Sequence, residues 1–221
     1  MDNRTAMAAL VAQKRFGAVL ATKGWRRRGE GAGTTRHTCR SLPPSIQELV
    51  SLASSSDRGE NLTSSSRSQV EDICNAVESE NRSRDSSVGG KELSKTWKLL
   101  FTTEKETLFI TSNAKKYFGL ETEVSQIIDL ESGKLQNLIA FDNGAAFVVD
   151  SSIELEESSC RSNFSFVSAK FILPSGSVIG LPPFGRGWFD TLYVDGQYRL
   201  ARDSRGDILL VQNAGEPEFK E

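Results

Sequence analysis

The spacing of apolar residues changes once along this chain, near residue 93. Before that point apolar residues recur every three or four positions, and after it they alternate with polar residues over short runs. The first spacing is typical of an amphipathic helix and the second of a β-strand with one buried face. The pattern therefore predicts a short helical segment followed by a long series of strands.

Two helices are expected in the first segment, over residues 45–53 and 68–81. In each, the first serine (Ser45 and Ser68) lies three residues before a glutamate, which is the spacing of a capping box. The apolar positions that recur at helical spacing predict the faces that pack on a core: Ile46, Leu49, Val50, Ala53, Val70, Ile73, Cys74 and Val77. A Ser-rich polar loop is expected between the two helices.

Ten strands are expected after residue 93. They cover residues 95–103, 106–111, 122–130, 134–141, 145–155, 161–173, 177–180, 190–194, 197–202 and 207–212. Glycine-containing turns separate most of them, so they form hairpins in series. A long antiparallel meander hides its edges by closing into an up-and-down barrel, so the predicted fold is mainly β.

A barrel of this size is either filled by its own side chains or holds one small apolar ligand. In the first strand Trp97, Leu99 and Phe101 share one face because side chains alternate along a strand. We expect this face to lie inside the barrel.

Charge is distributed unevenly along the 221 residues. The first 40 residues hold nine Lys or Arg and two acidic residues, whereas the rest holds 18 basic and 27 acidic residues. The basic segment resembles an organelle targeting peptide, and the alternative is a basic tail that stays attached. The acidic remainder predicts no nucleic-acid binding. The longest apolar run, residues 6–12, is too short for a transmembrane segment.

Few residues are available for catalysis. The single histidine, His37, lies in the basic segment, and Cys39, Cys74 and Cys160 have no CxxC spacing. A histidine triad and a histidine or cysteine metal site are therefore not expected in the mature chain. No cofactor and no metal are predicted.

Four blocks of the sequence resemble one family. They are "DRGE" at 57–60, "VEDICNAVESEN" at 70–81, "ELSKTWKLLFTTE" at 92–104 and "GWFDTLYVDGQYRLARDSRGDILLV" at 187–211. Together they are similar to the plastid-lipid-associated proteins, also called plant fibrillins, from about residue 45 to the C-terminus. The resemblance implies a plastid protein, in the stroma or at a plastoglobule or thylakoid, with a lipocalin-like antiparallel up-and-down β-barrel behind two short helices.

The charge, the spacing of apolar residues and the resemblance together predict four parts. Residues 1–40 are expected to be a plastid transit peptide that is cleaved, residues 41–92 a helical segment with a Ser-rich loop, residues 93–214 the lipocalin-like barrel, and residues 215–221 a short tail. For residues 1–40 the alternative from composition is import into mitochondria. The resemblance also implies a non-enzymatic protein that binds or stabilises apolar lipids, isoprenoids or pigments at plastoglobules or thylakoids. The alternative is a scaffold protein with a filled barrel, which recruits a partner enzyme of plastid lipid or isoprenoid metabolism.

Candidate site residues follow from the strand pattern and the aromatic loop at 181–189. Those predicted to contact a ligand are Trp97, Leu99, Phe101, Phe184, Trp188, Tyr193 and Arg199. Asp190 is expected to form a structural ion pair with Arg199 or Arg202 across the closing strands. The alternative is that an arginine at the barrel mouth holds the head group of a ligand. Tyr193 also has the alternative of packing its ring in the barrel wall.

Overall fold

The computed structural model describes residues 42–82, 90–156, 159–182 and 185–221. The helical elements are α2 (Pro44–Ser55), the short 3₁₀ helix η2 (Asp57–Gly59), α3 (Ser64–Arg82), the 3₁₀ helix η3 (Lys91–Leu93) and α4 (Lys105–Phe118). The strands are β1 (Thr96–Thr102), β2 (Thr122–Asp129), β3 (Lys134–Phe141), β4 (Ala146–Leu155), β5 (Arg161–Ile172), β6 (Val178–Leu181), β7 (Arg186–Val194), β8 (Tyr198–Asp203) and β9 (Ile208–Asn213). The predicted transit peptide at residues 1–40 lies outside the described residues.

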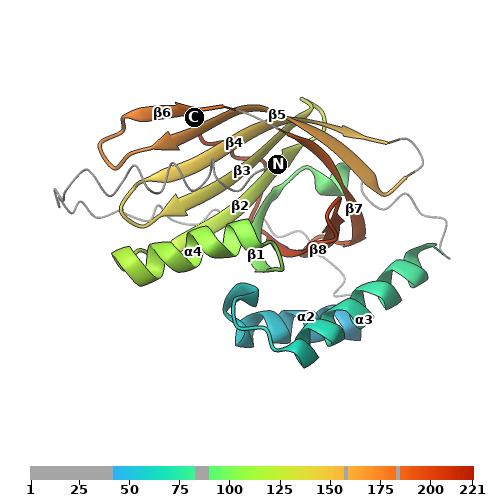
Figure 1. The fold of residues 1–221 in the computed structure, drawn as a ribbon. Helices are drawn as coiled ribbons and strands as arrows, with labels where there is room; N and C mark the ends of the chain where they lie inside the picture. The colour runs from blue at the N-terminus through green and yellow to red at the C-terminus, as the bar shows by residue number, and fades with distance from the viewer. Residues whose placement is uncertain (1–41, 83–89, 157–158, 183–184) are drawn as a thin grey trace, which may run out of the picture.

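The strands form one closed antiparallel ring, visible in Figure 1. Each of β1 to β5 pairs with the next strand, β5 pairs with β7, and β7, β8 and β9 continue the order. The ring closes because β9 pairs with β1. β6 pairs only with the end of β5 and stays outside the ring. The predicted mainly β fold, a barrel behind two short helices, is confirmed.

Helices α2 and α3 pack against the outer face of the barrel, below the ring in Figure 1. Their buried residues join residues of β1, β7, β8 and β9 in what we call the helix–barrel cluster: Ile46, Leu49, Ala53, Val70, Ile73, Cys74, Val77, Phe101, Leu192, Leu200, Ile208 and Leu210. The face predicted from helical spacing is thus the buried face. Full burial of one such aliphatic side chain stabilises the fold by about 1.5 to 3 kcal/mol.

Both helices start differently from the prediction. α2 begins at Pro44, and its N-cap residue Pro43 makes no side-chain hydrogen bond, so the expected cap at Ser45 is not formed. Proline suits the first turn because the N–H it lacks has no helical partner there. α3 begins at Ser64, before the predicted Ser68, because the Thr63 hydroxyl accepts a hydrogen bond from the backbone N–H of Ser66 at 3.1 Å.

The strand predicted at residues 106–111 is wrong, because this segment lies within α4. The helix ends at Gly119, which adopts the left-handed conformation (φ 66°) and donates its N–H to the carbonyl of Lys115 at 3.0 Å. Lysines at 115 and 116 suit the last turn because the helix dipole is negative there. Its apolar residues are three in a row, 108–110, and so short an apolar run does not distinguish a strand from a helix by periodicity.

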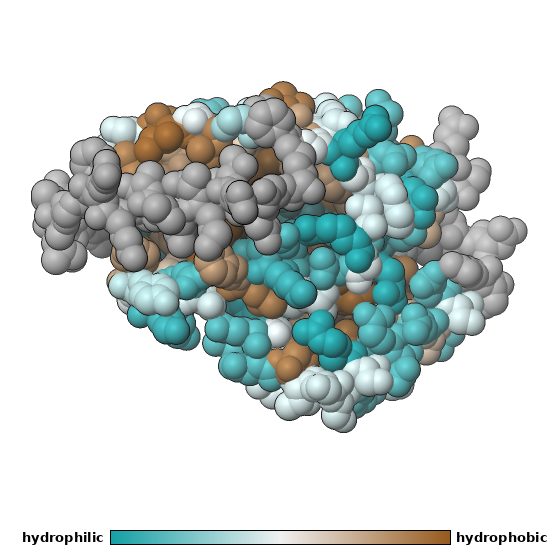
Figure 2. All heavy atoms as spheres, in the orientation of Figure 1, coloured by the Kyte–Doolittle hydropathy of each residue, from teal (hydrophilic) through white to brown (hydrophobic). Residues whose placement is uncertain are grey.

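Large apolar side chains are exposed mainly on two elements, α4 and β6. Phe109, Tyr117 and Phe118 lie on α4, and Val178 and Ile179 lie on β6. Figure 2 shows hydrophobic atoms at the upper left, where Figure 1 places β6. Within the described part of the chain, no helix combines the length and hydropathy needed to cross a membrane.

Candidate functional site

The inside of the barrel is lined by apolar side chains that alternate with outward-facing residues along the strands. Its buried apolar members, which we call the luminal cluster, are Leu93, Trp97, Leu99, Ile128, Leu135, Ile153, Phe189, Ala201 and Val211. They come from η3 and from strands around the whole ring. The cluster is separate from the helix–barrel cluster on the outer face.

Trp97 anchors one end of this interior. Its side chain is fully buried, and the indole N–H donates a hydrogen bond to the carbonyl of Leu93 at 2.9 Å. This bond ties η3 to β1 and satisfies the polar atom of a buried indole. Trp97 therefore fills space in the lumen and also fixes the segment that leads into the barrel.

Arg199 of β8 is the charged residue of the interior. Its side chain is fully buried, and the guanidinium carbon lies 5.6 Å from the centre of the Trp97 ring and 5.1 Å from that of Phe189. One nitrogen, Nη2, donates to the side-chain oxygen of Gln126, whose amide donates in turn to Asn137 at 2.9 Å. Burial lowers the pKa of Arg199 to about 9, because the charged form loses its hydration.

The residues predicted to contact a ligand are divided between two faces. Trp97, Leu99 and Arg199 lie together inside the barrel, whereas Phe101 and Tyr193 pack in the helix–barrel cluster. The prediction that Phe101 faces the lumen is wrong. The register of β1 shifts between Leu99 and Phe101, and such a bulge turns the residues after it to the other face.

Tyr193 follows a similar bulge, because the register of β7 shifts between Thr191 and Tyr193. Its ring packs against the helix–barrel cluster, and its hydroxyl donates to the Asp195 carboxylate at 2.6 Å. This is the predicted alternative of a tyrosine packed in the barrel wall. Phe184 lies outside the described residues.

Trp188 lies on the outer side of β7, where its ring is covered by an arginine. The guanidinium carbon of Arg161 is 3.7 Å from the centre of the indole ring. The same guanidinium donates two hydrogen bonds, at 2.8 and 2.9 Å, to the Asp190 carboxylate. Trp188, Arg161 and Asp190 thus form one stacked, ion-paired group between β5 and β7.

The prediction that Asp190 pairs with Arg199 or Arg202 is wrong. Arg199 points into the barrel, whereas Asp190 is on the outer face with Arg161. Arg202 lies opposite Asp190 in the β7–β8 register but reaches to Glu71 of α3 at 3.0 Å. Arg161 was missed because β5 and β7 are separated by β6 in the sequence and become neighbours only in the closed ring.

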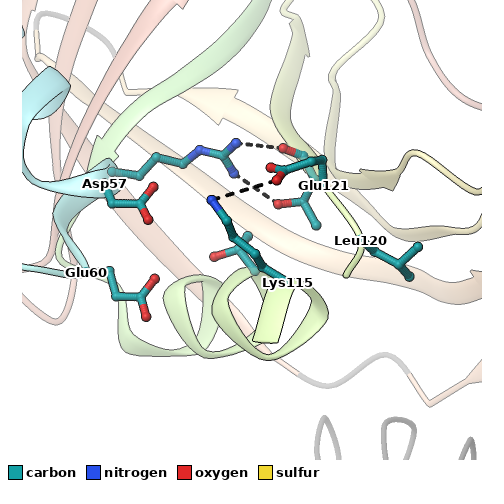
Figure 3. A pocket seen from close by; sticks show the side chains of 8 residues that line it. Asp57, Glu60, Lys115, Leu120 and Glu121 are labelled. Atoms are coloured by element: carbon teal, nitrogen blue, oxygen red, sulfur yellow. Dashed lines mark hydrogen bonds and ion pairs between the residues drawn. The ribbon is translucent and has the colours of Figure 1, made fainter. Parts of the chain in front are cut away.

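A shallow cleft lies where η2, α4 and the start of β2 meet (Figure 3). Arg58 crosses it and donates to the hydroxyl and the carbonyl oxygen of Thr122, at 3.0 and 2.7 Å. Lys115 and Glu121 form an ion pair at 3.7 Å in the same cleft. Because these polar groups bind one another, we interpret the cleft as a joint between the helical segment and the barrel.

In the described part of the chain, no three acidic, histidine or cysteine side chains are grouped to hold a metal ion. Cys74 is buried in the helix–barrel cluster, and burial raises the pKa of its thiol to about 12. A thiol in this state is not a nucleophile near neutral pH.

Comparison with known proteins identifies the family. The family model PAP_fibrillin matches residues 45–212, which run from α2 into β9 and so include both helices and the barrel. The chain belongs to the PAP_fibrillin family. A relative from Arabidopsis thaliana, "Probable plastid-lipid-associated protein 11, chloroplastic", is 40% identical over 169 residues, which cover 76% of this chain and 78% of the relative. The resemblance stated from the sequence is confirmed, and the relative supports a plastid location.

In this PAP_fibrillin protein, the sequence blocks that carry the resemblance meet in space. The opening block forms β1 and the closing block forms most of β7 through β9, and β1 pairs with β9. Trp97 of the first block and Arg199 of the second therefore lie side by side in the lumen. The two blocks are one structural unit at the point where the barrel closes.

Proposed function

We propose that this PAP_fibrillin protein is a non-enzymatic plastid protein that associates with apolar lipids by docking on the surface of a plastoglobule or thylakoid. The observation that carries the proposal is the outer side of α4, where Phe109 and Tyr117 are 44% and 66% exposed. The name of the Arabidopsis relative, a plastid-lipid-associated protein, supports the same role.

The outer side of α4 has the pattern of an interfacial helix. Thr111 and Ala114 are the buried residues of α4 and face the barrel. Lys105, Phe109 and Lys116 are exposed and recur at spacings of four and seven, so they share the opposite side of the helix. Tyr117 lies next to Lys116 in the last turn and is 66% exposed. Phe118 follows the buried Ala114 by four residues, so it lies on the barrel side of the last turn. We call Lys105, Phe109, Lys116 and Tyr117 the α4 face.

The charge of the α4 face favours an anionic lipid surface. Lys105 and Lys116 are exposed, and the Lys116 ammonium lies 5.4 Å from the centre of the Tyr117 ring. The carboxylates near the start of the helix, Glu104 and Glu106, are both paired with Arg205, at 2.7 and 3.1 Å. Aromatic rings at the level of the head groups and lysines among them are the usual composition of such surfaces.

The state of the histidine, cysteine and carboxylate side chains, which are the usual catalytic groups, supports a non-enzymatic role. The single histidine of the sequence is His37, in the segment expected to be removed. Cys74 is buried with a raised pKa. Arg161, Arg202 and Arg205 engage carboxylates in ion pairs, among them Asp190, Glu71, Glu104 and Glu106.

Vesicle flotation tests the proposal. Phosphatidylcholine vesicles with and without phosphatidylglycerol are mixed with the mature protein and with the double variant Lys105→Gln/Lys116→Gln. A lysine near an anionic surface contributes about 1 kcal/mol, so we expect the double variant to bind anionic vesicles about 30-fold more weakly. Phe109→Ser should weaken binding to both kinds of vesicle, because it removes apolar contact area.

Two matched controls change the same chemistry elsewhere. Val167→Ser removes an exposed apolar side chain of β5, which is 62% exposed, and Lys134→Gln removes an exposed lysine of β3. Both controls should float like the wild type. Equal losses in the controls and the α4 variants, or no flotation of the wild type, would overturn the proposal and favour the scaffold alternative.

A further inference from the structure

The guanidinium of Arg199 has unused hydrogen-bonding capacity inside the barrel. Gln126 accepts from Nη2, but Nε and Nη1 have no hydrogen-bond partner among the described residues. Buried polar groups are normally hydrogen-bonded, and an unpaired buried charge is strongly destabilising. The fold therefore holds two donors of a cation in an apolar interior without a partner from the protein.

Three other arginines that contact the barrel strands are paired with carboxylates. Arg161 pairs with Asp190, Arg202 with Glu71, and Arg205 with Glu104 and Glu106. Arg199 differs from these because no carboxylate of the described chain lies within ion-pair distance of it, although it is the most buried of the four. The rings of Trp97 and Phe189 offset part of the charge but accept no hydrogen bond along the plane of the guanidinium.

Further donors lie on the neighbouring strands. The hydroxyls of Ser162 and Thr191 are buried and unpartnered in the described structure. Ser162 is opposite Phe189 in the β5–β7 register, and Thr191 is two residues from Phe189 on the same strand, so both share its inward face. Asp203 is opposite Phe189 in the β7–β8 register, but its carboxylate accepts hydrogen bonds from Arg205 and from the N–H of Asp207. The described wall beside the guanidinium thus carries unpartnered hydroxyls, and its carboxylate is engaged elsewhere.

A ligand that approaches the Arg199 guanidinium from solvent passes the side-chain amides of Gln126 and Asn137. Arg199 and Trp97 have no surface accessible to water, whereas Gln126 and Asn137 are only half-buried. Farther along β4 and β5, the inward-facing Val149 and Phe166 are also half-buried. A ligand that enters from this side reaches Arg199 by displacing the Gln126 side chain.

We propose that the lumen binds an amphiphile with an apolar chain and an oxyanion head group, a carboxylate or a phosphate, whose oxygens accept hydrogen bonds from Nε and Nη1 of Arg199. The head group supplies the negative charge that the protein lacks at this place, and charge-assisted hydrogen bonds to guanidinium are among the strong ones. The chain of the amphiphile lies toward Asn137, Val149 and Phe166. This site is separate from the α4 face, so the luminal site and the docking of the α4 face can be tested independently.

Binding of parinaric acid, a fluorescent fatty acid, tests the site in comparison with its methyl ester. The two probes share the apolar chain and differ in the anionic head. We expect the wild-type protein to bind the acid about tenfold to 150-fold more tightly than the ester. Equal affinities for acid and ester would overturn the proposal, and this comparison needs no variant. Competition by dodecyl phosphate, but not by inorganic phosphate, would show that the head can be a phosphate and that the chain is required.

Variants then assign the preference to Arg199. In Arg199→Met and Arg199→Gln the acid should bind only as well as the ester, while the melting temperature is unchanged or raised, because a buried unpaired charge is removed. Arg186→Met changes the same charge at an exposed position of β7 and should keep the preference for the acid. If both Arg199 variants still bound the acid more tightly than the ester, the assignment of the head-group site to Arg199 would be contradicted. Vesicle flotation of Arg199→Met should equal that of the wild type, which keeps this test distinct from that of the α4 face.

Discussion

At the residue scale, the face of the barrel decides what each arginine does. Arg161 and Arg202 lie on the outer face, where each meets a carboxylate, and Arg199 lies on the inward face of β8, where it meets aromatic rings. Inward and outward positions differ by one residue along a strand, because side chains alternate. Arg199 and Arg202 are three residues apart, an odd spacing, so they lie on opposite faces of β8. Arg199 therefore points into the lumen, and Arg202 forms an ion pair on the outside.

A double-mutant cycle tests the pairing of Asp190. Asp190→Asn and Arg161→Met should each lower the free energy of unfolding by about 1 to 2 kcal/mol, because the pair is bidentate but partly exposed. In the double variant, urea unfolding should show a loss smaller than the sum, with a coupling of about 1 kcal/mol. Asp190→Asn combined with Arg199→Met is the control and should be additive. Additive losses in the first cycle would contradict the pairing.

At the scale of elements, η2 connects the helical segment to the barrel through an unusual backbone. Asp57, Arg58 and Gly59 all have positive φ, at 48°, 61° and 106°. A Cβ atom on Gly59 would lie 2.2 Å from the carbonyl oxygen of Thr102 on β1. Only glycine permits this close approach, and Arg58 then reaches across to Thr122. The "DRGE" block is thus the joint between helices and barrel.

Substitution of Gly59 by alanine should lower the free energy of unfolding far more than the same substitution at a glycine with open space around it. Gly144 also has a positive φ, 88°, but a Cβ there would meet nothing within 4 Å. Gly144→Ala should lower the free energy of unfolding by about 1 to 2 kcal/mol, the penalty of the left-handed backbone. Gly59→Ala adds a backbone clash and should lower it by about 3 kcal/mol or more, measured by chemical denaturation. Equal losses would contradict this account of η2.

At the scale of the whole molecule, the C-terminal segment holds strands of the barrel together from outside. The Thr96 hydroxyl of β1 donates to the carbonyl of Glu216 at 2.8 Å and accepts from the N–H of Glu218 at 3.0 Å. The Gln136 amide of β3 donates to the carbonyl of Lys220 at 2.9 Å and accepts from its N–H at 2.7 Å. Residues 216–220 therefore run from β1 to β3, across β2.

Removal of residues 216–221 should lower the free energy of unfolding by about 2 kcal/mol. The four hydrogen bonds each contribute about 0.5 to 1.5 kcal/mol, less the entropy of ordering the segment. Lys220→Ala is the matched control, because the bonds at this position use the backbone, and it should change stability by no more than about 0.5 kcal/mol. A truncated protein as stable as the wild type in urea would show that the segment has no structural role.

The sequence by itself determined the family and the elements other than α4, which was predicted as a strand. Helical spacing identified the buried faces of α2 and α3, and alternation identified each strand of the ring, because these patterns are local and one face of each element is buried. The parity of β1 correctly placed Trp97 and Leu99 inside the barrel. The end blocks were sufficient to name the family that the comparison then confirmed.

Only the tertiary structure decided which residues meet. Bulges moved Phe101 and Tyr193 to the outer face, and a bulge depends on the partner strand and leaves no mark in the alternation before it. The pairing of β5 with β7, which leaves out the intervening β6, brought Arg161 to Asp190. Closure of the ring by β9 and β1 left Arg199 among Trp97, Phe189 and Gln126, with two nitrogen donors unpartnered in the described structure. A buried charge has a counter-charge only if one of the strands around the lumen supplies it. A local pattern in the sequence therefore does not predict whether Arg199 is paired.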